Sequence, residues 1–310
     1  MRFLADDLKE RYHGKIYKLT LSSGCTCPNR DGTIGFGGCT FCSEGGSGEF
    51  ASPFLPVSEQ ISLAKEVIRN KRKDRENSTD REKEDTGKYI AYFQSFTNTY
   101  GDIDRLRLLY EETIRRDDIV ILSLGTRPDC LGKDVMDLLS DLNRIKPVWV
   151  ELGLQTVHEK TAKEIRRGYS LPVFEDAYRR LKEIGITVIV HVIFGLPGET
   201  KQDMLDTVEY LSGLSPHLDG IKLQMLNILK GTALGEAYEK EPFPLLSMEE
   251  YTDLAAESIR MLQEDTVIHR MTGDGPKDLL IAPDWVKNKK PVLNAIRRKL
   301  KMPRHSGRDI

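Results

Sequence analysis

The sequence lacks a long apolar run, a large net charge and an even set of cysteines, and each absence excludes a class of protein. Its longest apolar stretch, residues 186–196, is too short to cross a bilayer and contains His191. Residues 1–15 are charged from Arg2 onward and lack the apolar core of a signal peptide, so we expect no export. The 46 Lys and Arg against 48 Asp and Glu leave a net charge of −2, which predicts no general attraction to charged partners.

The five cysteines are an odd number in a chain without an export signal, which predicts reduced thiols and a cytoplasmic location. Hydrophobic residues make up 39% of the chain and charged residues 30%, as in an ordinary soluble protein. A chain of 310 residues can bury one large core with a modest appendage.

Three of the cysteines lie in one glycine-rich stretch, which reads CPNRDGTIGFGGCTFC and places them at Cys27, Cys39 and Cys42. Iron–sulfur cubanes normally take four cysteine ligands, so a set of three leaves one iron open to a small molecule. The four glycines between Cys27 and Cys39 would let the backbone wrap closely around a bulky cluster. The stretch therefore indicates a metal centre with an exchangeable position.

Two other kinds of site remain open on spacing alone. Cys25 precedes the stretch and completes a Cys-x-Cys and Cys-x-x-Cys set, which is typical of structural zinc. The chain would then be a zinc-stabilised nucleic-acid-binding module. With Cys25 as a fourth ligand to an iron–sulfur cluster, it would instead be a closed electron carrier.

The whole chain resembles the radical S-adenosylmethionine (SAM) superfamily and, within it, the YhcC/YtqA-like group, whose cluster loop reads much like this one. Most of the superfamily spaces its cysteines C-x3-C-x2-C, whereas this group and its Elp3-like relatives widen the first gap, here to eleven residues. The resemblance implies that Cys27, Cys39 and Cys42 hold a [4Fe-4S] cluster and that SAM chelates the open iron. It also implies that Phe41 packs beside the adenine. Cys25 lies where relatives carry an apolar residue, so it is left out of the ligand set.

Short β-branched and aromatic runs alternate with amphipathic helical stretches, which is typical of β/α units around a parallel sheet. The predicted strands are residues 16–21, 89–94, 119–124, 148–152, 187–194 and 221–226. The predicted helices are residues 58–70, 102–115, 132–144, 172–184 and 200–214, with Ser58 and Thr200 as N-caps and Gly185 as a C-terminal stop. Six strands are too few for a closed eight-stranded barrel, and the resemblance implies a partial (β/α)6 TIM-like barrel.

Two segments depart from this pattern. Residues 70–88 hold thirteen charged residues of nineteen and no apolar face, which predicts a solvated insert. From about residue 231 the pattern becomes mainly helical, notably over 247–263, and resembles the C-terminal extension of Elp3-like radical SAM proteins. We therefore expect a barrel at residues 1–230 and a C-terminal extension with a basic tail at residues 231–310.

Residues that bind ligands in β/α barrels lie at the C-terminal ends of the strands, and five such ends here are rich in glycine and polar residues. Glu151 and Gln155 could bind the ribose diol or the amino group of SAM. Gln94 occupies the position of a Gly-Gly-Glu motif in many relatives, so amino-group recognition there would differ. The turn that begins at Ile193 resembles the adenine-contacting strand of the superfamily, where Gly195 permits close approach. Each polar residue could also serve only as a turn or helix cap.

Polar residues after the strands are also candidates for substrate contact, chiefly Gln94, Tyr100 and Arg127. Arg127 and Asp129 could equally form a buried ion pair, and Cys130 could be a small packed residue. His191 is expected to be a hydrogen-bonded core residue rather than a base. No catalytic side chain is assigned.

The last part of the sequence is basic, because residues 287–304 contain eight Lys or Arg and no acidic residue. A solvated helix face would explain such a run in general. Uncompensated cations also favour contact with nucleic-acid phosphates, and we select Arg297, Arg298 and Lys299 for this role. Trp285 could stack a base, although burial against the barrel is the preferred prediction.

Together these resemblances predict a cytoplasmic radical SAM enzyme in which the reduced cluster cleaves SAM and a 5′-deoxyadenosyl radical abstracts a hydrogen atom from the substrate. The YtqA-like branch implies tRNA wobble-uridine modification, from 5-carboxymethylaminomethyl to 5-aminomethyl. Abstraction from the carboxymethyl carbon and loss of a second electron would give an imine that water hydrolyses. The YhcC-like branch has no such assignment, so a substrate other than tRNA remains an alternative. We expect a flavodoxin- or ferredoxin-type electron donor and no membrane partner.

Overall fold

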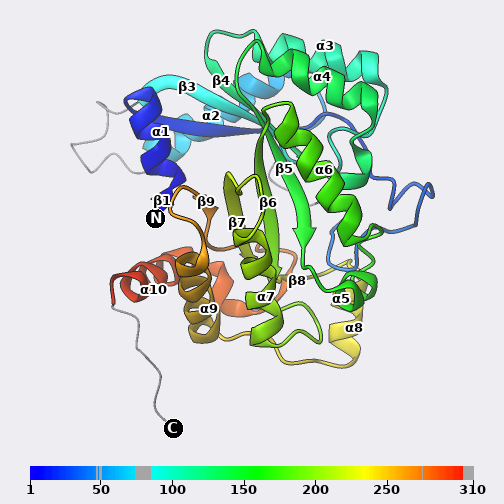
Figure 1. The fold of residues 1–310 in the computed structure, drawn as a ribbon, viewed down its shortest axis with the longest axis vertical. Coiled ribbons are helices and arrows are strands. Elements are labelled where there is room, and N and C mark those ends of the chain that lie inside the picture. The colour runs from blue at the N-terminus through cyan, green and yellow to red at the C-terminus, as the bar shows by residue number, and fades with distance from the viewer. Residues whose placement is uncertain (47, 49–50, 74–84, 274, 303–310) are drawn as a thin grey trace.

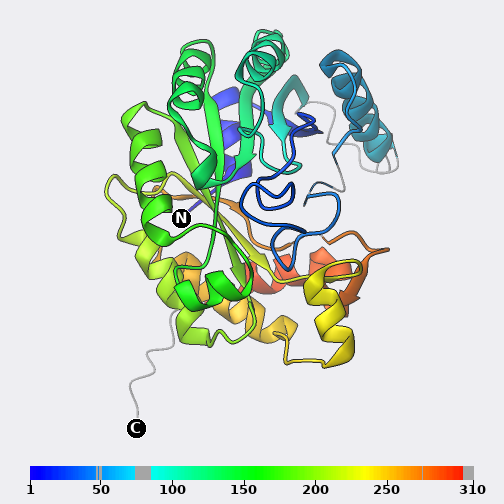
Figure 2. The ribbon, with the colours of Figure 1, turned by 90° about the vertical axis from the view of Figure 1, so that its right-hand side faces the viewer.

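The sheet at the centre of the protein is an open, curved barrel wall. The structure, a computed structural model, describes residues 1–46, 48, 51–73, 85–273 and 275–302. Eight strands pair in the order β1-β9-β7-β6-β5-β4-β3-β2, and every neighbouring pair is parallel. β1 and β2 are the two edges, so the sheet curls without closing, and helices cover its outer side (Figures 1 and 2). The predicted partial barrel is confirmed.

Six of the strands follow the β/α pattern that the sequence predicts. They are β2 (Lys15–Leu21), β3 (Asp85–Phe93), β4 (Ile119–Thr126), β5 (Val148–Gln155), β6 (Thr187–Phe194) and β7 (Gly220–Met225). The predicted helices are present as α2 (Val57–Lys73), α3 (Ile103–Ile114), α4 (Lys133–Asn143), α6 (Leu171–Glu183), α7 (Lys201–Ser212) and α9 (Met248–Met261). Their bounds differ from the predicted bounds by a few residues.

Local chemistry at the helix ends explains two of the predicted boundaries and corrects a third. Thr200 caps α7 by accepting from the Asp203 amide, and the Asp203 carboxylate accepts from the Thr200 amide at 2.7 Å. Gly185 follows α6 with a φ of +75°, which glycine adopts without strain. The prediction that Ser58 caps α2 is wrong, because the helix begins before it, at Val57, and the amides of Glu59 and Gln60 donate to the Pro56 carbonyl.

Several further elements complete the fold. They are β1 (Arg2–Phe3), α1 (Leu4–Tyr12), α5 (Glu159–Glu164), β8 (Ile228–Leu229), α8 (Ala233–Lys240), β9 (Val267–Arg270), β10 (Leu280–Ala282), α10 (Lys289–Lys301) and the 3-10 helices Pro128–Cys130 and Asp284–Lys287. β9 enters the main sheet between β1 and β7. The segment after residue 231 therefore supplies a strand of the barrel wall as well as helices.

α9 lies beside α7 and α10 on the outer side of the barrel (Figure 1). The predicted domain boundary near residue 230 falls between β8 and α8 and stays a prediction. α2 and β3 extend into the predicted charged insert, and the centre of that insert, residues 74–84, lies outside the described residues. In the described part of the chain, no helix has the length and apolar character needed to cross a membrane.

Side chains inside the barrel form layers, because residues two apart on a strand share a face. The layer nearest the N-terminal ends of the strands is apolar and packs against Leu8 of α1; it consists of Ile16, Ile90, Ile121, Trp149 and Ile189. The next inward positions form a polar layer of Lys18, Tyr92, Ser123, Glu151, His191 and Lys222. This polar layer is the floor on which the candidate site is built.

Candidate active site

A cavity of about 240 Å³ opens at the C-terminal ends of the strands. Its lining combines the cysteine loop after β2 with residues of β3 to β7 and of β9. Figure 2 shows the loop, in dark blue, within the arc formed by the barrel and the C-terminal segment. The three cysteines of the loop all line this cavity, as do four members of the polar layer, and these residues are Cys27, Cys39, Cys42, Tyr92, Glu151, His191 and Lys222.

Tight turns give the cysteine loop its shape. The Arg30 amide donates to the Cys27 carbonyl at 2.8 Å, and the Cys42 amide donates to the Cys39 carbonyl at 2.9 Å. Gly38, directly before Cys39, has a φ of +82°, which side-chain-bearing residues rarely adopt. The loop backbone therefore turns sharply after Cys27 and again between Cys39 and Cys42.

The three cysteines fit a cluster of several metal atoms better than a single zinc ion. A tetrahedral Zn²⁺ with bonds of about 2.3 Å holds its sulfur ligands about 3.8 Å apart. Among the described residues, no group of three ligand atoms that includes these thiols lies within 4.8 Å of one another. Cys25 does not join them, because it is buried in the apolar core, where its Sγ accepts from Arg105 Nη2 at 3.3 Å. The geometry thus disfavours both four-cysteine alternatives.

The electrostatics of Cys39 also fit a metal ligand. Burial, together with the neighbouring Cys42 and Cys27, raises the pKa of Cys39 to about 12, while the charge of Arg127 opposes this shift. Asn29 Nδ2 lies 3.6 Å from the Cys39 sulfur and donates to it. A thiol in such surroundings ionises when a metal supplies positive charge. The donor set present therefore fits an iron–sulfur cluster held by three thiolates.

Two of the predicted adenine neighbours lie together in the cavity wall. Phe41 and Ile193 both line the cavity and belong to one apolar cluster, with Ile165, Leu196 and Leu226. Gly195 does not line the cavity; its φ is +83° and its amide donates to the Met204 sulfur at 3.0 Å. The adenine contacts stay predictions, and both side chains offer apolar surface to the cavity for them.

Gln94 and Gln155 line the same cavity at the ends of β3 and β5. Gln155 has a φ of +64°, and the Tyr169 hydroxyl donates to its side-chain oxygen at 3.1 Å. A non-glycine residue in this conformation costs of the order of 1 kcal/mol and tends to occur where function fixes the backbone. The predicted contact between Gln155 and SAM gains support from this strain but stays a prediction.

Arg127 lines the cavity and forms the ion pair with Asp129 that the sequence left open, although Arg127 is buried and Asp129 is exposed. Its Nε and Nη2 donate to the two Asp129 oxygens at 2.9 and 2.7 Å, and its guanidinium lies 4.9 Å from the Tyr169 ring. Cys130 does not line the cavity, and burial, followed by the Asp129 charge, raises its pKa to about 12. Tyr100 lies outside the lining, with its hydroxyl 2.7 Å from Thr33 of the cysteine loop.

Glu151 is the centre of the polar layer. Its carboxylate accepts from Lys18 at 3.1 Å, from Ser123 at 3.0 Å and from His191 at 2.9 Å, and it forms an ion pair with Lys222. Burial alone would raise the pKa of Glu151, but the charges of Lys18 and Lys222 hold it well below its usual range. His191 is a hydrogen-bonded interior residue, as expected. A contact between Glu151 and SAM would compete with these bonds and stays a prediction.

Sequence reasoning did not single out Lys18, Lys222 or Arg270. A usable signal was present, since Lys222 is the single charged residue of GIKLQM and Lys18 lies in the middle of KIYKLTL, between Tyr17 and Leu19. Tyr92 is buried, and Lys222 Nζ lies 3.2 Å from its hydroxyl. The interior position of these polar groups follows from period-two alternation once the strands are known.

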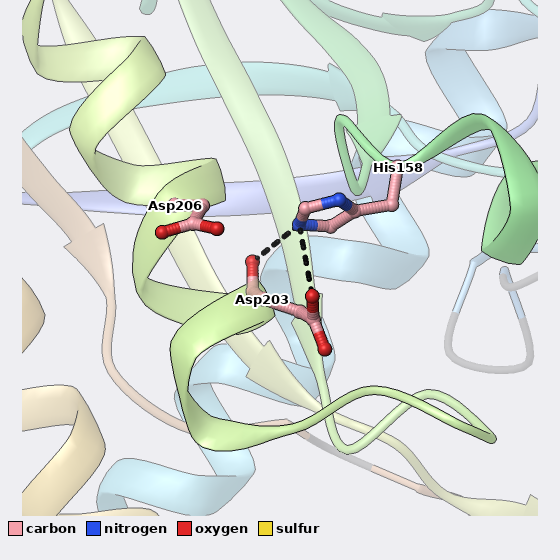
Figure 3. A group of neighbouring side chains, drawn as sticks. All are labelled: His158, Asp203 and Asp206. Carbon is pink, nitrogen blue, oxygen red and sulfur yellow. Dashed lines mark hydrogen bonds and ion pairs between the residues drawn. The ribbon is translucent and has the colours of Figure 1, made fainter.

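A second group of potential metal ligands lies outside the cavity, where α7 meets the segment after β5 (Figure 3). His158 Nε2 lies 2.9 Å from the Asp203 carbonyl oxygen, so this nitrogen donates to the backbone. The Asp203 carboxylate caps α7 through Thr200, and Asp206 accepts from Gln202 at 2.7 Å. These groups are used by the fold, and Figure 3 shows no interaction between Asp206 and the other two side chains.

The basic residues near the end of the chain lie on α10. Arg297 and Arg298 are exposed, and Lys299 forms an ion pair with Asp253 of α9. In Figure 1, α10 lies at the lower left, whereas the cysteine loop, in blue, lies on the right. None of the three basic residues lines the cavity. Trp285 packs against the core, as preferred, and its Nε1 donates to the Leu246 carbonyl at 3.0 Å.

Comparison with known proteins agrees with this site. Residues 23–211 match the family model described as the radical SAM superfamily, and residues 218–302 match the model of the radical SAM C-terminal domain. The chain is 42% identical to YtqA of Bacillus subtilis (strain 168) over 294 residues, which are 94% of this chain and 87% of YtqA. It is 37% identical to YhcC of Escherichia coli (strain K12) over 284 residues, 91% of this chain and 86% of YhcC.

A solved structure shares the fold. The archaeal Methanocaldococcus infernus Elp3 superposes with a TM-score of 0.61 and 17% identity, covering 78% of this chain and 57% of that chain. At this level of identity the likeness concerns the arrangement of strands and helices alone.

Proposed function

The chain belongs to the radical SAM superfamily, and from this membership we propose that it modifies a wobble uridine of tRNA, converting a 5-carboxymethylaminomethyl group to 5-aminomethyl. The enzyme uses a [4Fe-4S] cluster and SAM, and Cys27, Cys39 and Cys42 would hold the cluster. When bound, the cluster and SAM supply the chemistry that abstracts a hydrogen atom from a carbon atom of the substrate. The resemblance to the YtqA-like branch over 94% of the chain supports the choice of substrate.

The single observation that carries the proposal is the cavity that joins the three cysteines to the polar layer. A group placed in it meets the cysteine loop on one side and the charged side chains of Glu151, Lys222 and Arg270 on the other. A uridine with a short ionic side chain matches this arrangement, with the base at the mouth and the side chain directed along the strands. The buried layer excludes water from the reacting carbon and orients the side chain.

The protonation states of the polar layer suit this orienting role. The pKa of His191 is lowered to about 4, chiefly by burial, so its imidazole is neutral near pH 7. Glu151 is ionised and holds the Lys222 ammonium in place. The polar layer thus presents hydrogen-bond donors in fixed positions to the substrate, rather than a group that exchanges a proton with it.

The exposed Arg297 and Arg298, with Lys299, would bind tRNA phosphates. Because α10 lies on the other side of the molecule from the cysteine loop, these contacts would involve a part of the tRNA away from the modified base (Figure 1). We further propose a cytoplasmic location and a flavodoxin- or ferredoxin-type electron donor, as the sequence predicts.

The proposal is tested with anaerobically reconstituted protein, reductant, SAM and tRNA that carries 5-carboxymethylaminomethyluridine. We expect 5-aminomethyluridine in the digested tRNA, formed in step with 5′-deoxyadenosine, and neither product with the Cys39→Ala variant. Formation of 5′-deoxyadenosine with an unchanged tRNA would contradict the tRNA substrate and would return the choice to a non-tRNA substrate.

A further inference from the structure

The cavity contains more basic than acidic side chains. Of the described residues that line it, Glu151 is the single acidic one, whereas the basic ones are Arg30, Arg127, Lys222 and Arg270. Two of these arginines are engaged near the cysteine loop, because Arg127 pairs with Asp129 and Arg30 donates to the Cys42 carbonyl at 2.8 Å. The remaining two, Lys222 and Arg270, lie in the interior of the barrel.

Arg270 has no ionic partner in the part of the chain that the structure describes. Its Nη1 lies 3.4 Å from the neutral side-chain oxygen of Gln224, which is a long hydrogen bond. Arg270 is the register partner of Lys222 across the β9–β7 pair, so the two basic side chains stand on neighbouring strands. A half-buried guanidinium with five donors and one long neutral contact has unused capacity for an anion.

Lys222 shares its one carboxylate with other donors. Glu151 also accepts from Lys18 and His191, and Lys222 is 2% exposed, with its ammonium 4.5 Å from the centre of the Tyr92 ring. Burial lowers the pKa of Lys222, Glu151 opposes this effect, and the charges of Lys18 and Arg270 add to the lowering. A second anion beside Lys222 and Arg270 would offset both burial and mutual repulsion.

We propose that Arg270 and Lys222 bind a carboxylate carried by the substrate, so that the barrel selects substrates by the negative charge at the end of a short side chain. This inference rests on the proposed function, in which the carboxymethyl group of the modified uridine supplies that carboxylate. A planar guanidinium donates to both carboxylate oxygens at once, and the Lys222 ammonium adds a third donor. Glu151 acts as a positioning residue, because its ion pair holds Lys222 in place.

Equilibrium binding without turnover tests the inference. The reconstituted protein, with SAM and without reductant, is titrated with 5-carboxymethylaminomethyluridine and with 5-methylaminomethyluridine, which lacks the carboxylate. Wild type should bind the carboxylate ligand more tightly, and Arg270→Gln should reduce that preference by about 10- to 100-fold, the worth of charge-assisted hydrogen bonds. Arg115→Gln, an exposed substitution at the end of α3, should keep the full preference.

A second variant, Lys222→Met, and a second ligand, SAM, distinguish a carboxylate site from a SAM site. Lys222→Met should also reduce the preference, with thermal melting used to verify that the variant is folded. SAM affinity should be unchanged in Arg270→Gln. If Arg270→Gln weakens SAM binding and leaves the nucleoside preference intact, Arg270 belongs to the SAM site and the inference is overturned. Equal binding of the two nucleosides by wild type overturns it as well.

The tRNA conversion assay tests the proposed function independently of the carboxylate site. Carboxylate preference without conversion of tRNA would retain the carboxylate site and reject the tRNA substrate. Conversion of tRNA without carboxylate preference would retain the tRNA substrate and reject the carboxylate site.

Discussion

Glu151 of β5 and Lys222 of β7 form an ion pair inside the barrel, with side chains that are 0% and 3% exposed. Moving two charged groups from water into the core costs free energy. Their mutual attraction offsets this cost only when further hydrogen bonds satisfy the remaining donors and acceptors of both groups. Lys18, Ser123 and His191 provide those bonds to Glu151. A fold rarely keeps such a network in a core that could be apolar, so we attribute it to the contents of the cavity above it.

Glu151→Gln should destabilise the protein by about 3–5 kcal/mol, because it leaves the buried Lys222 and the partly buried Lys18 without their carboxylate. Urea unfolding of the purified variant measures this change. The control, Glu183→Gln, alters an exposed pair with Arg179 on α6 and should change stability by less than about 1 kcal/mol. Similar unfolding free energies for the two variants would show that the buried pair contributes little.

Stability should also depend on pH through His191. Burial, and then the charge of Lys222, lowers the pKa of its imidazole to about 4, whereas an unfolded histidine titrates near 6.5. The folded state thus binds fewer protons, and the stability that His191 contributes is complete above about pH 6.5 and is lost as the pH falls toward about 4.

His191→Gln keeps a donor toward Glu151 but does not titrate. Between about pH 7 and pH 5, wild type should lose more unfolding free energy than this variant, as measured by denaturant titration at each pH. Equal losses in the two proteins would mean that His191 titrates normally in the folded state.

Cys39→Ala should abolish cluster binding, whereas Cys25→Ala should retain the cluster, because Cys25 is buried in the core beside Arg105 and away from the cavity. Iron and sulfide content after reconstitution distinguishes the two variants. Loss of the cluster from Cys25→Ala with retention by Cys27→Ala would move the ligand set by two residues.

Arg297→Gln combined with Arg298→Gln should weaken tRNA binding and reduce its salt dependence by about two counterions. Lys299 is kept in this variant, because its ion pair with Asp253 would confuse affinity with stability. A matched pair of exposed substitutions, Arg115→Gln with Arg179→Gln, serves as the control. If the dependence of tRNA affinity on salt concentration is unchanged, Arg297 and Arg298 belong to a solvated helix face that does not bind tRNA.

The six central strands and the cysteine loop could be predicted from the sequence, because strand alternation, helix periodicity and cysteine spacing are local signals. β9 could not, since its four residues, Val267–Arg270, gain their place by pairing with β7 and β1, which lie far away in the chain. The same long-range pairing brings Arg270 beside Lys222. The polar layer could therefore not be predicted from the sequence, although each of its residues can be identified within its own strand.

The most direct test of the account is a metal and product analysis of wild-type protein purified and reconstituted without oxygen. The account predicts about four iron and four sulfide per chain, and reductant-dependent conversion of SAM to 5′-deoxyadenosine. A colourless protein with one zinc per chain and no SAM cleavage would contradict it.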